Sequence, residues 1–116
     1  TLIESGAYHA TWCDVHLGPE QAVAAHLMVR GRVMMPVHWG MFDLAMHGWT
    51  EPAERVRAAA ARVGVSVAFP RPGESVTPEA YRADPWWPDL PWETAAEAPA
   101  NSTHLPDSVQ ALIPMP

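Results

Sequence analysis

The sequence predicts a small α/β domain, in which helices pack against a sheet of three strands. Strand-like apolar runs alternate with segments of helical periodicity from Thr1 to Phe69, and glycine or proline residues separate these segments. The chain has 116 residues, of which 48% are hydrophobic, and these values are typical of one globular domain. Beyond Val76 this alternation stops and the chain becomes rich in proline.

The first strand and the first helix are predicted between Thr1 and Gly31. The apolar run from Thr1 to Ile3 predicts a strand, and a loop follows it. A helix is expected over about residues 19–30, because Pro19 suits the first helical position and Glu20 complements the helix dipole. Gly31 is the expected left-handed cap. The residues that share one stripe of this helix are Ala22, Val23, His26, Leu27 and Arg30.

The second strand is predicted over residues 32–37 and ends directly before His38. Pro36 cannot donate a hydrogen bond to a sheet, so we expect it at the end of the strand or at a bulge. A strand end holds a side chain within the narrow tolerance that metal or acid/base chemistry requires. His38 therefore stands at a favourable position for a functional site, and Gly40 allows the backbone to turn sharply after it.

The second helix is expected to begin near Thr50 and to end at Gly64, followed by a short strand over residues 65–69. A proline and acidic residues mark the start of this helix. The buried stripe is predicted to contain Ala53, Val56, Ala60 and Val63, whereas Arg55, Arg57 and Arg62 are placed on other faces.

The last third of the chain is predicted to be an extended tail. Ten of the thirteen prolines lie at or after Pro70, and the tryptophan-rich stretch at residues 84–92 has neither a helical nor a strand period. We therefore divide the chain into residues 1–78, which form the α/β unit, and residues 79–116, a Pro/Trp-rich tail that packs only through its tryptophans.

Composition excludes several classes of partner. The formal net charge is -6 and all seven basic residues are arginines without a cluster, so nucleic acid is not an expected partner. No apolar run reaches the roughly 18 residues needed to span a bilayer, and the start lacks a secretion signal, so a cytoplasmic protein is expected. The chain opens on Thr1, already inside a strand, so we expect it to be the later part of a longer protein, with a processed start as the alternative.

Two of the six histidines, His16 and His38, occupy positions where a loop meets a regular element. His38 is either a site residue or a core histidine bonded to the backbone, and residue type alone leaves both open. His16 is a cap-region residue, an acid/base group or a ligand. The spacing of the histidines matches no self-sufficient zinc motif, and with Cys13 alone any metal would need histidine and carboxylate ligands.

The other polar candidates are three histidines and two aspartates. His26 lies on the helix stripe and is expected to be structural, whereas His9 and His47 lie in loops near aromatic residues, as on a pocket rim. Asp14 and Asp43 are the carboxylates nearest to the candidate histidines in the sequence, and either is able to orient an imidazole.

Several short motifs occur in a fixed order over about residues 1–76. They are Gly6 Ala7 Tyr8, the run His16 Leu17 Gly18 Pro19 Glu20 Gln21 Ala22 Val23, then Pro36 Val37 His38 Trp39 Gly40, Glu51 Pro52 and Pro72 Gly73 Glu74. Together they resemble the C-terminal part of the metallo-β-lactamase superfamily. The branch they resemble most is that of N-acyl-phosphatidylethanolamine phospholipase D and its bacterial relatives, and the ascorbate-phosphate lactonases are more distant.

This resemblance implies a four-layer αβ/βα sandwich that binds one or two metal ions, usually zinc, where strand ends meet. It implies that a metal-bound hydroxide attacks a phosphodiester, lactone or similar ester in a small-molecule or lipid-like substrate. By the same match His38 is the final metal-ligand histidine, and His16 is a catalytic residue that positions or protonates the substrate.

The chain also departs from this family. The hallmark His-x-His-x-Asp-His cluster does not occur in it, so the site is expected to be incomplete and the isolated chain inactive. Met41 stands where a threonine commonly follows the His-Trp-Gly triplet. The competing hypothesis is a non-enzymatic α/β interaction module that binds a partner through exposed aromatics, and a third is self-association of the fragment through an uncovered apolar face.

Overall fold

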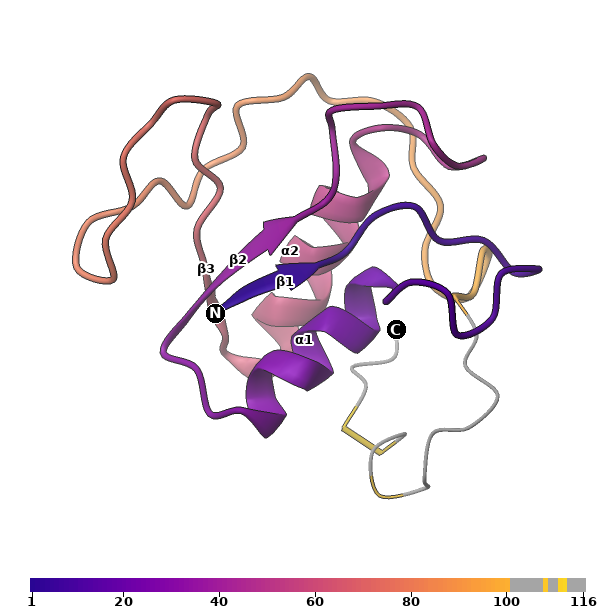
Figure 1. Cartoon of the computed structure of the whole chain (residues 1–116), viewed down its shortest axis with the longest axis horizontal. Helices are drawn as coiled ribbons and strands as arrows, with labels where there is room; N and C mark the ends of the chain where they lie inside the picture. The colour runs from indigo at the N-terminus through magenta and orange to yellow at the C-terminus, as the bar shows by residue number, and fades with distance from the viewer. Residues whose placement is uncertain (101–107, 109–110, 113–116) are drawn as a thin grey trace.

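The computed structural model describes residues 1–100, 108 and 111–112. Strands and helices alternate in it (Figure 1), which confirms the predicted α/β class. None of the helices in this part of the chain is both long enough and apolar enough to cross a membrane. The elements are β1 (Leu2–Glu4), α1 (Pro19–Met28), β2 (Val33–Val37), α2 (Glu51–Val63) and β3 (Ser66–Val67).

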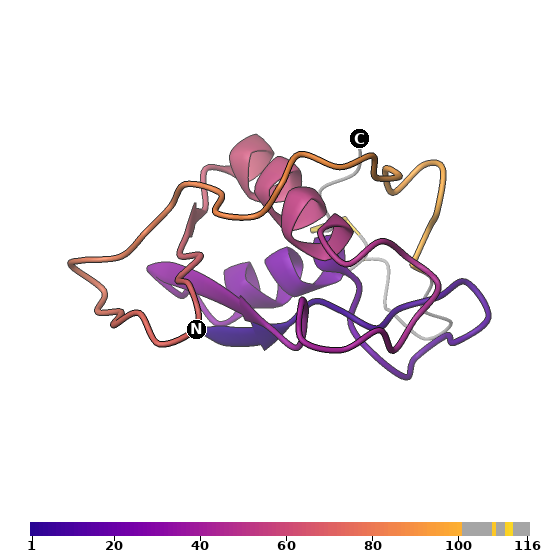
Figure 2. The ribbon, with the colours of Figure 1, turned by 90° about the horizontal axis from the view of Figure 1, so that it is seen from above.

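The strands form one parallel sheet in the order β1-β2-β3. Because each helix connects two neighbouring parallel strands, and such crossovers share one hand, both helices lie on the same face of the sheet. Figure 2 shows α1 and α2 stacked on that face. Within the described residues no helix or strand covers the opposite face, so the second half of an αβ/βα sandwich stays a prediction.

The core lies between the sheet and the two helices. Met34 of β2 is fully buried and belongs to one cluster with Val23 of α1 and Val56 of α2. Phe69 and Trp87 close this cluster beyond the end of β3. The alternation of buried and partly exposed residues along β2 follows from the two-residue period of a strand, which sends every second side chain to the helices.

Pro36 lies inside β2, the central strand, and it removes a hydrogen-bond donor on one side of this strand only. The N–H of Met35 donates to β1, so the ring nitrogen of Pro36, the next residue, faces β3. Pairing between β2 and β3 accordingly stops at the Met34–Val67 pair. The missing donor explains why β3 has only two residues, fewer than the five expected.

Helix α1 ends at Met28, earlier than expected, and its predicted cap is wrong. The residue in the left-handed region is Arg30, with a φ of 55°, and not Gly31. Glycine is needed at position 31 for another reason, since an added Cβ would lie 2.7 Å from the His26 ring nitrogen Nδ1. The cap predicted at the end of α2 is confirmed, because Gly64 has a φ of 70°.

The placement of Arg55 away from the buried face is wrong. Its side chain is buried between the helices, where it makes two hydrogen bonds of 2.9 and 2.7 Å to the carboxylate of Glu20. A third bond of 2.8 Å runs to the carbonyl of Ala98. The guanidinium is tolerated inside because each of these contacts replaces water, and the pair joins α1 to α2.

Residues 79–100 contain no helix or strand, yet they contact the rest of the chain through more than their tryptophans. Trp87 does pack into the core, and its ring lies 5.1 Å from that of Trp39. The backbone of Glu93 also donates to Glu51, and Ala95 is buried. The expectation that this segment packs only through tryptophans is therefore wrong, while its boundary at residue 79 stays a prediction.

Candidate metal centre

The carboxyl ends of β1 and β2 meet at one edge of the sheet. Glu4 is the last residue of β1 and His38 follows the last residue of β2, so the parallel pairing brings the two together. His16 reaches the same edge from the loop before α1. Each of the three offers one ligand atom, and these atoms all lie within 4.8 Å of one another.

The structure thus brings together both histidines predicted as site residues. The ring centroids of His16 and His38 are 5.0 Å apart, and the side chain of His38 is exposed. His38 is therefore not sealed inside the core, which was the structural alternative for it. Glu4, which the sequence argument did not select, completes the group.

The carboxylate of Glu4 is bound at both oxygens. Oε2 lies 3.2 Å from Nδ1 of His16, and Oε1 accepts a bond of 3.1 Å from the backbone N–H of Leu17. The side chains of His16 and Glu4 are 31% and 37% exposed, so solvent reaches this pair.

The backbone around His38 is constrained. His38 has a φ of 63°, in the left-handed region that costs a non-glycine residue about 1–3 kcal/mol. The next residue, Trp39, is held by a bond of 3.1 Å from its indole N–H to the carbonyl of Pro36. Gly40 turns the chain away with a φ of 73°, as predicted.

Gly6 has a packing role at the same edge. A Cβ at this position would collide with the backbone carbonyl of His38 and would lie 3.2 Å from the Cα of Trp39. The exits of β1 and β2 are therefore as close as backbones permit, and only glycine fits. This contact holds the His38 backbone from the β1 side.

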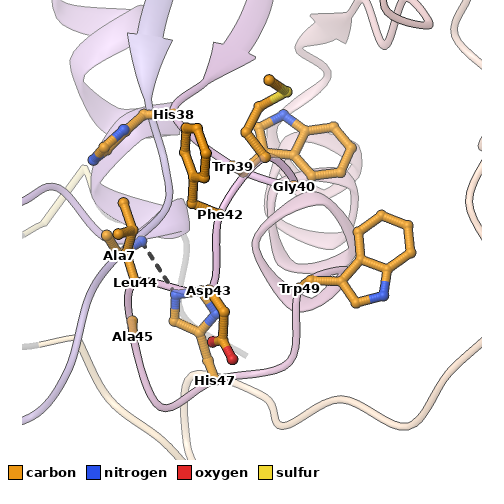
Figure 3. A pocket seen from close by; sticks show the side chains of 11 residues that line it. Ala7, His38, Trp39, Gly40, Phe42, Asp43, Leu44, Ala45, His47 and Trp49 are labelled. Carbon is orange, nitrogen blue, oxygen red and sulfur yellow. Dashed lines mark hydrogen bonds between the residues drawn. The ribbon is translucent and has the colours of Figure 1, made fainter.

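A pocket of about 190 Å³ opens beside His38. Figure 3 shows that its wall is built mainly by the loop after β2, with Ala7 from the loop after β1. His47 on the rim accepts a bond of 3.1 Å from the N–H of Ala7 and stacks on the ring of Tyr8. The lining is largely apolar and consists of Ala7, His38, Trp39, Gly40, Met41, Phe42, Asp43, Leu44, Ala45, His47 and Trp49.

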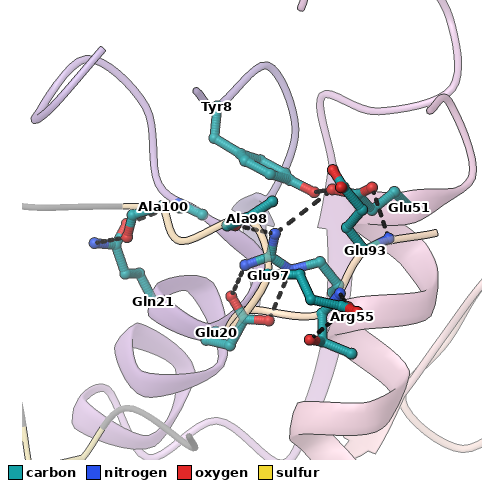
Figure 4. Close-up of polar contacts among 11 residues, drawn as sticks. Tyr8, Glu20, Gln21, Glu51, Arg55, Glu93, Glu97, Ala98 and Ala100 are labelled. Carbon is teal, nitrogen blue, oxygen red and sulfur yellow. Dashed lines mark hydrogen bonds and ion pairs between the residues drawn. The ribbon is translucent and has the colours of Figure 1, made fainter. Parts of the chain in front are cut away.

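Tyr8, which stacks on the pocket-lining His47, belongs to a buried polar network (Figure 4). The hydroxyl of Tyr8 donates a bond of 2.6 Å to Glu51, and the guanidinium of Arg55 lies 4.8 Å from the Tyr8 ring centroid. Burial raises the pKa of Tyr8 far above its usual value, so this hydroxyl keeps its proton and remains a donor. The network anchors the loop after β1 to both helices.

The remaining candidates take other places. His26 is buried with its Nδ1 2.7 Å from the hydroxyl of Thr1, which agrees with its predicted structural role. His9 bonds to Thr11 near the surface, and Asp43 lines the pocket that His38 also lines. His104 lies outside the described residues. The only sequence signal for Glu4 is its position as a polar residue directly after the apolar run of β1, and it points to a site only once β1 is known to pair with β2.

The donor set fits a divalent transition metal. Two imidazoles and one carboxylate are ligands that zinc and non-haem iron accept, and the exposure of His38 leaves room for further ligands. Within the described part of the chain, Glu4, His16 and His38 form a group whose donor atoms lie close enough together for such an ion.

Comparison with known proteins points in the same direction. The chain is 50% identical over 91 residues to uncharacterised proteins of Mycobacterium bovis and Mycobacterium tuberculosis, a match that covers 75% of this chain and 24% of each relative. It is 38% identical over 61 residues to a UPF0173 metal-dependent hydrolase of Symbiobacterium thermophilum, covering 53% of this chain and 26% of that protein. No family model and no solved structure matches the chain.

The chain thus spans about a quarter of the length of the curated relatives it matches. The distant similarity to a protein named as a metal-dependent hydrolase is consistent with the metallo-β-lactamase superfamily. The group formed by Glu4, His16 and His38 is one that could hold a metal ion.

Proposed function

We propose that this chain is the C-terminal part of a zinc-dependent hydrolase with the metallo-β-lactamase fold, acting on phosphodiester, lactone or related ester bonds. The observation that carries the proposal is the convergence of Glu4, His16 and His38 where β1 and β2 end. Two of these residues belong to the motifs on which the family resemblance rests.

His38 is assigned as a metal ligand and His16 as a catalytic residue that positions or protonates the substrate. His38 suits the first role because it is exposed and follows a strand that fixes its backbone. His16 suits the second because its ring lies 5.0 Å from that of His38, close enough for a substrate bound at the metal to touch both. A bound zinc ion lowers the pKa of a water molecule and polarises the scissile group.

The remaining ligands for one or two zinc ions are assigned to the part of the protein outside this chain. The curated relatives are about four times as long as the matched segment, which leaves ample length for them. The uncovered face of the sheet is the surface on which that part would pack. The isolated chain is accordingly expected to be inactive.

The pocket beside His38 is assigned to the substrate. Its largely apolar wall suits a small or lipid-like ester, as the phospholipase D-like branch of the family would require. The acidic composition without a basic cluster accords with a cytoplasmic enzyme that does not bind nucleic acid.

The test uses the full-length protein with His38 replaced by alanine. Zinc content, measured by atomic absorption, and hydrolysis of bis(p-nitrophenyl) phosphate should fall together. The matched control is His9→Ala, because the His9 ring contacts its chain neighbours Thr11 and Trp12 and lies outside the group of donors. Unchanged zinc and activity in the His38 variant would refute the assignment.

The non-enzymatic interaction module remains the second candidate, because the loop after His38 exposes large apolar side chains. Phe42 is 75% exposed and Met46 is 82% exposed. This alternative predicts no zinc affinity even in the full-length protein. Self-association of the 116-residue chain through such surfaces is checked by sedimentation equilibrium.

A further inference from the structure

We propose that Glu4 is a positioning residue that holds the His16 imidazole with its hydrogen on Nδ1, so that Nε2 is the nitrogen presented to the substrate. The catalytic consequence rests on the proposed function, whereas the state of the ring can be observed without it. Neither the sequence motifs nor the relatives assign a role to Glu4.

The hydrogen on Nδ1 follows from the chemistry of the contact. Oε2 of Glu4 lies 3.2 Å from Nδ1 of His16. An ionised carboxylate only accepts hydrogen bonds, so Nδ1 must carry the hydrogen. In a neutral imidazole the other nitrogen, Nε2, then has the free lone pair.

Glu4 is itself well placed to impose this state. It ends a strand that is paired with β2, whereas His16 lies in a loop before α1. Its second oxygen accepts the N–H of Leu17, the residue directly after His16. One carboxylate therefore binds both the ring and the backbone of the loop, and the ring cannot rotate without breaking its hydrogen bond to Glu4.

This geometry favours a positioning role for Glu4 over metal ligation. Both of its oxygens already accept N–H donors, and a metal ion at either oxygen would displace one of them. His38 is exposed, and among the described residues no hydrogen bond engages its ring, which makes it the better ligand of the group. In this assignment Glu4 positions His16, and His38 is the metal ligand.

The arrangement gives His16 a defined chemical task. With Nδ1 held by Glu4, Nε2 accepts a hydrogen bond from an attacking water or hydroxyl group. When Nε2 is protonated, its N–H bond breaks as the proton moves to the leaving oxygen, and the electron pair stays on the ring nitrogen. The Nδ1 hydrogen remains in place throughout.

The first experiment determines the His16 tautomer in the 116-residue chain by two-bond 15N–1H correlation of histidine-labelled protein at alkaline pH. We expect hydrogen on Nδ1 in the wild type and a shift toward Nε2 in Glu4→Ala. Glu4→Gln keeps one acceptor and should shift the ring less. The matched control is Glu79→Gln, which removes an exposed carboxylate paired with Arg32. An unchanged tautomer in both Glu4 variants would overturn the proposal.

The second experiment measures kcat and zinc content in the full-length protein. Glu4→Ala should lower kcat by about 10–100-fold with zinc content unchanged. In a His16→Ala background it should cause no further loss, because it acts through His16. Loss of zinc, or additive losses in the double variant, would overturn the proposal. If the full-length wild type lacks zinc and hydrolytic activity, the proposed function fails, and the tautomer experiment still decides whether Glu4 holds His16.

Discussion

Two polar clusters of this molecule differ in how completely their groups are partnered. The inner cluster buries Arg55 against Glu20 and Glu51, and the carbonyl group of Ala98 accepts a further hydrogen bond from the guanidinium. The outer cluster, at the sheet edge, consists of an exposed His38 and the partly exposed pair of Glu4 and His16. Both contain charged residues brought from separate parts of the sequence.

The difference separates a structural role from a chemical one. Every charged group of the inner cluster is partnered within the protein, because Arg55 binds Glu20 and Glu51, and Glu51 also accepts hydrogen bonds from Tyr8 and Glu93. This cluster is therefore able to hold elements together but offers nothing to a ligand. The outer cluster places donor atoms within 4.8 Å of one another and leaves them open to solvent. Buried, fully partnered groups fix the fold, and partly exposed groups on that fixed frame are available for chemistry.

The largest expected effect concerns the inner cluster. Replacing Arg55 by alanine should lower the free energy of unfolding by about 3–5 kcal/mol, because the carboxylate of Glu20 would remain buried without its partner. The measurement is urea unfolding followed by tryptophan fluorescence. Arg57→Ala is the control, since its pair with Glu54 is largely at the surface and should contribute at most about 1 kcal/mol. Equal losses in the two variants would remove the distinction between the clusters.

The outer cluster should be most sensitive at its backbone. Replacing Gly6 by alanine should cost about 1–3 kcal/mol, since the new Cβ would push against the carbonyl of His38. The same change should weaken zinc binding by the full-length protein, because it displaces the strand end that carries His38. Gly48→Ala is the control, as its nearest neighbour would be a carbonyl oxygen at 3.9 Å. Similar stability and zinc affinity in both variants would contradict a tight backbone contact.

The left-handed conformation of His38 gives a smaller effect. Glycine adopts a φ of 63° without strain and alanine does not, so His38→Gly should be about 1 kcal/mol more stable than His38→Ala. Both variants should lose zinc equally, because both lack the imidazole. The comparison needs thermal unfolding of the two variants side by side. A less stable glycine variant would mean that the strain is not intrinsic to this residue.

Much of the fold could be predicted from the sequence because its signals are local. A proline and an acidic residue begin α1, and an apolar run ends at His38. The predictions were wrong where a contact with a distant segment determines the position of a side chain. The charge of Arg55 predicts an exposed side chain, and only the packing of α1 against α2 brings it to Glu20, 35 residues away.

The candidate site divides in the same way. His16 and His38 were selected because each stands where a loop meets a regular element, and this position is visible in the sequence. Glu4 was missed because its significance depends on the pairing of β1 with β2, which places it beside His38. Local patterns identify the residues at strand ends, and sheet topology determines which strand ends share an edge.

The smallest expected effect is the pH dependence of stability that the buried histidine, His26, contributes. Burial lowers the pKa of His26 below its usual 6.5, so the unfolded chain binds a proton at this residue more readily than the folded chain. Stability contributed by neutral His26 is therefore complete above pH 6.5 and decreases as the pH falls below that value. In urea titrations at pH about 8 and about 5, the wild type should lose more stability than His26→Gln.

This subtraction isolates His26, because His16, His38 and the other histidines remain in both proteins and contribute equally to each curve. His9→Gln is the matched control for a histidine-to-glutamine change, since His9 lies in a loop near the surface. Parallel curves for wild type and His26→Gln would contradict a folded-state penalty on the charged ring. A steeper wild-type curve would place His26 among the structural groups, in contrast to His16 and His38 in the group of donors at the sheet edge.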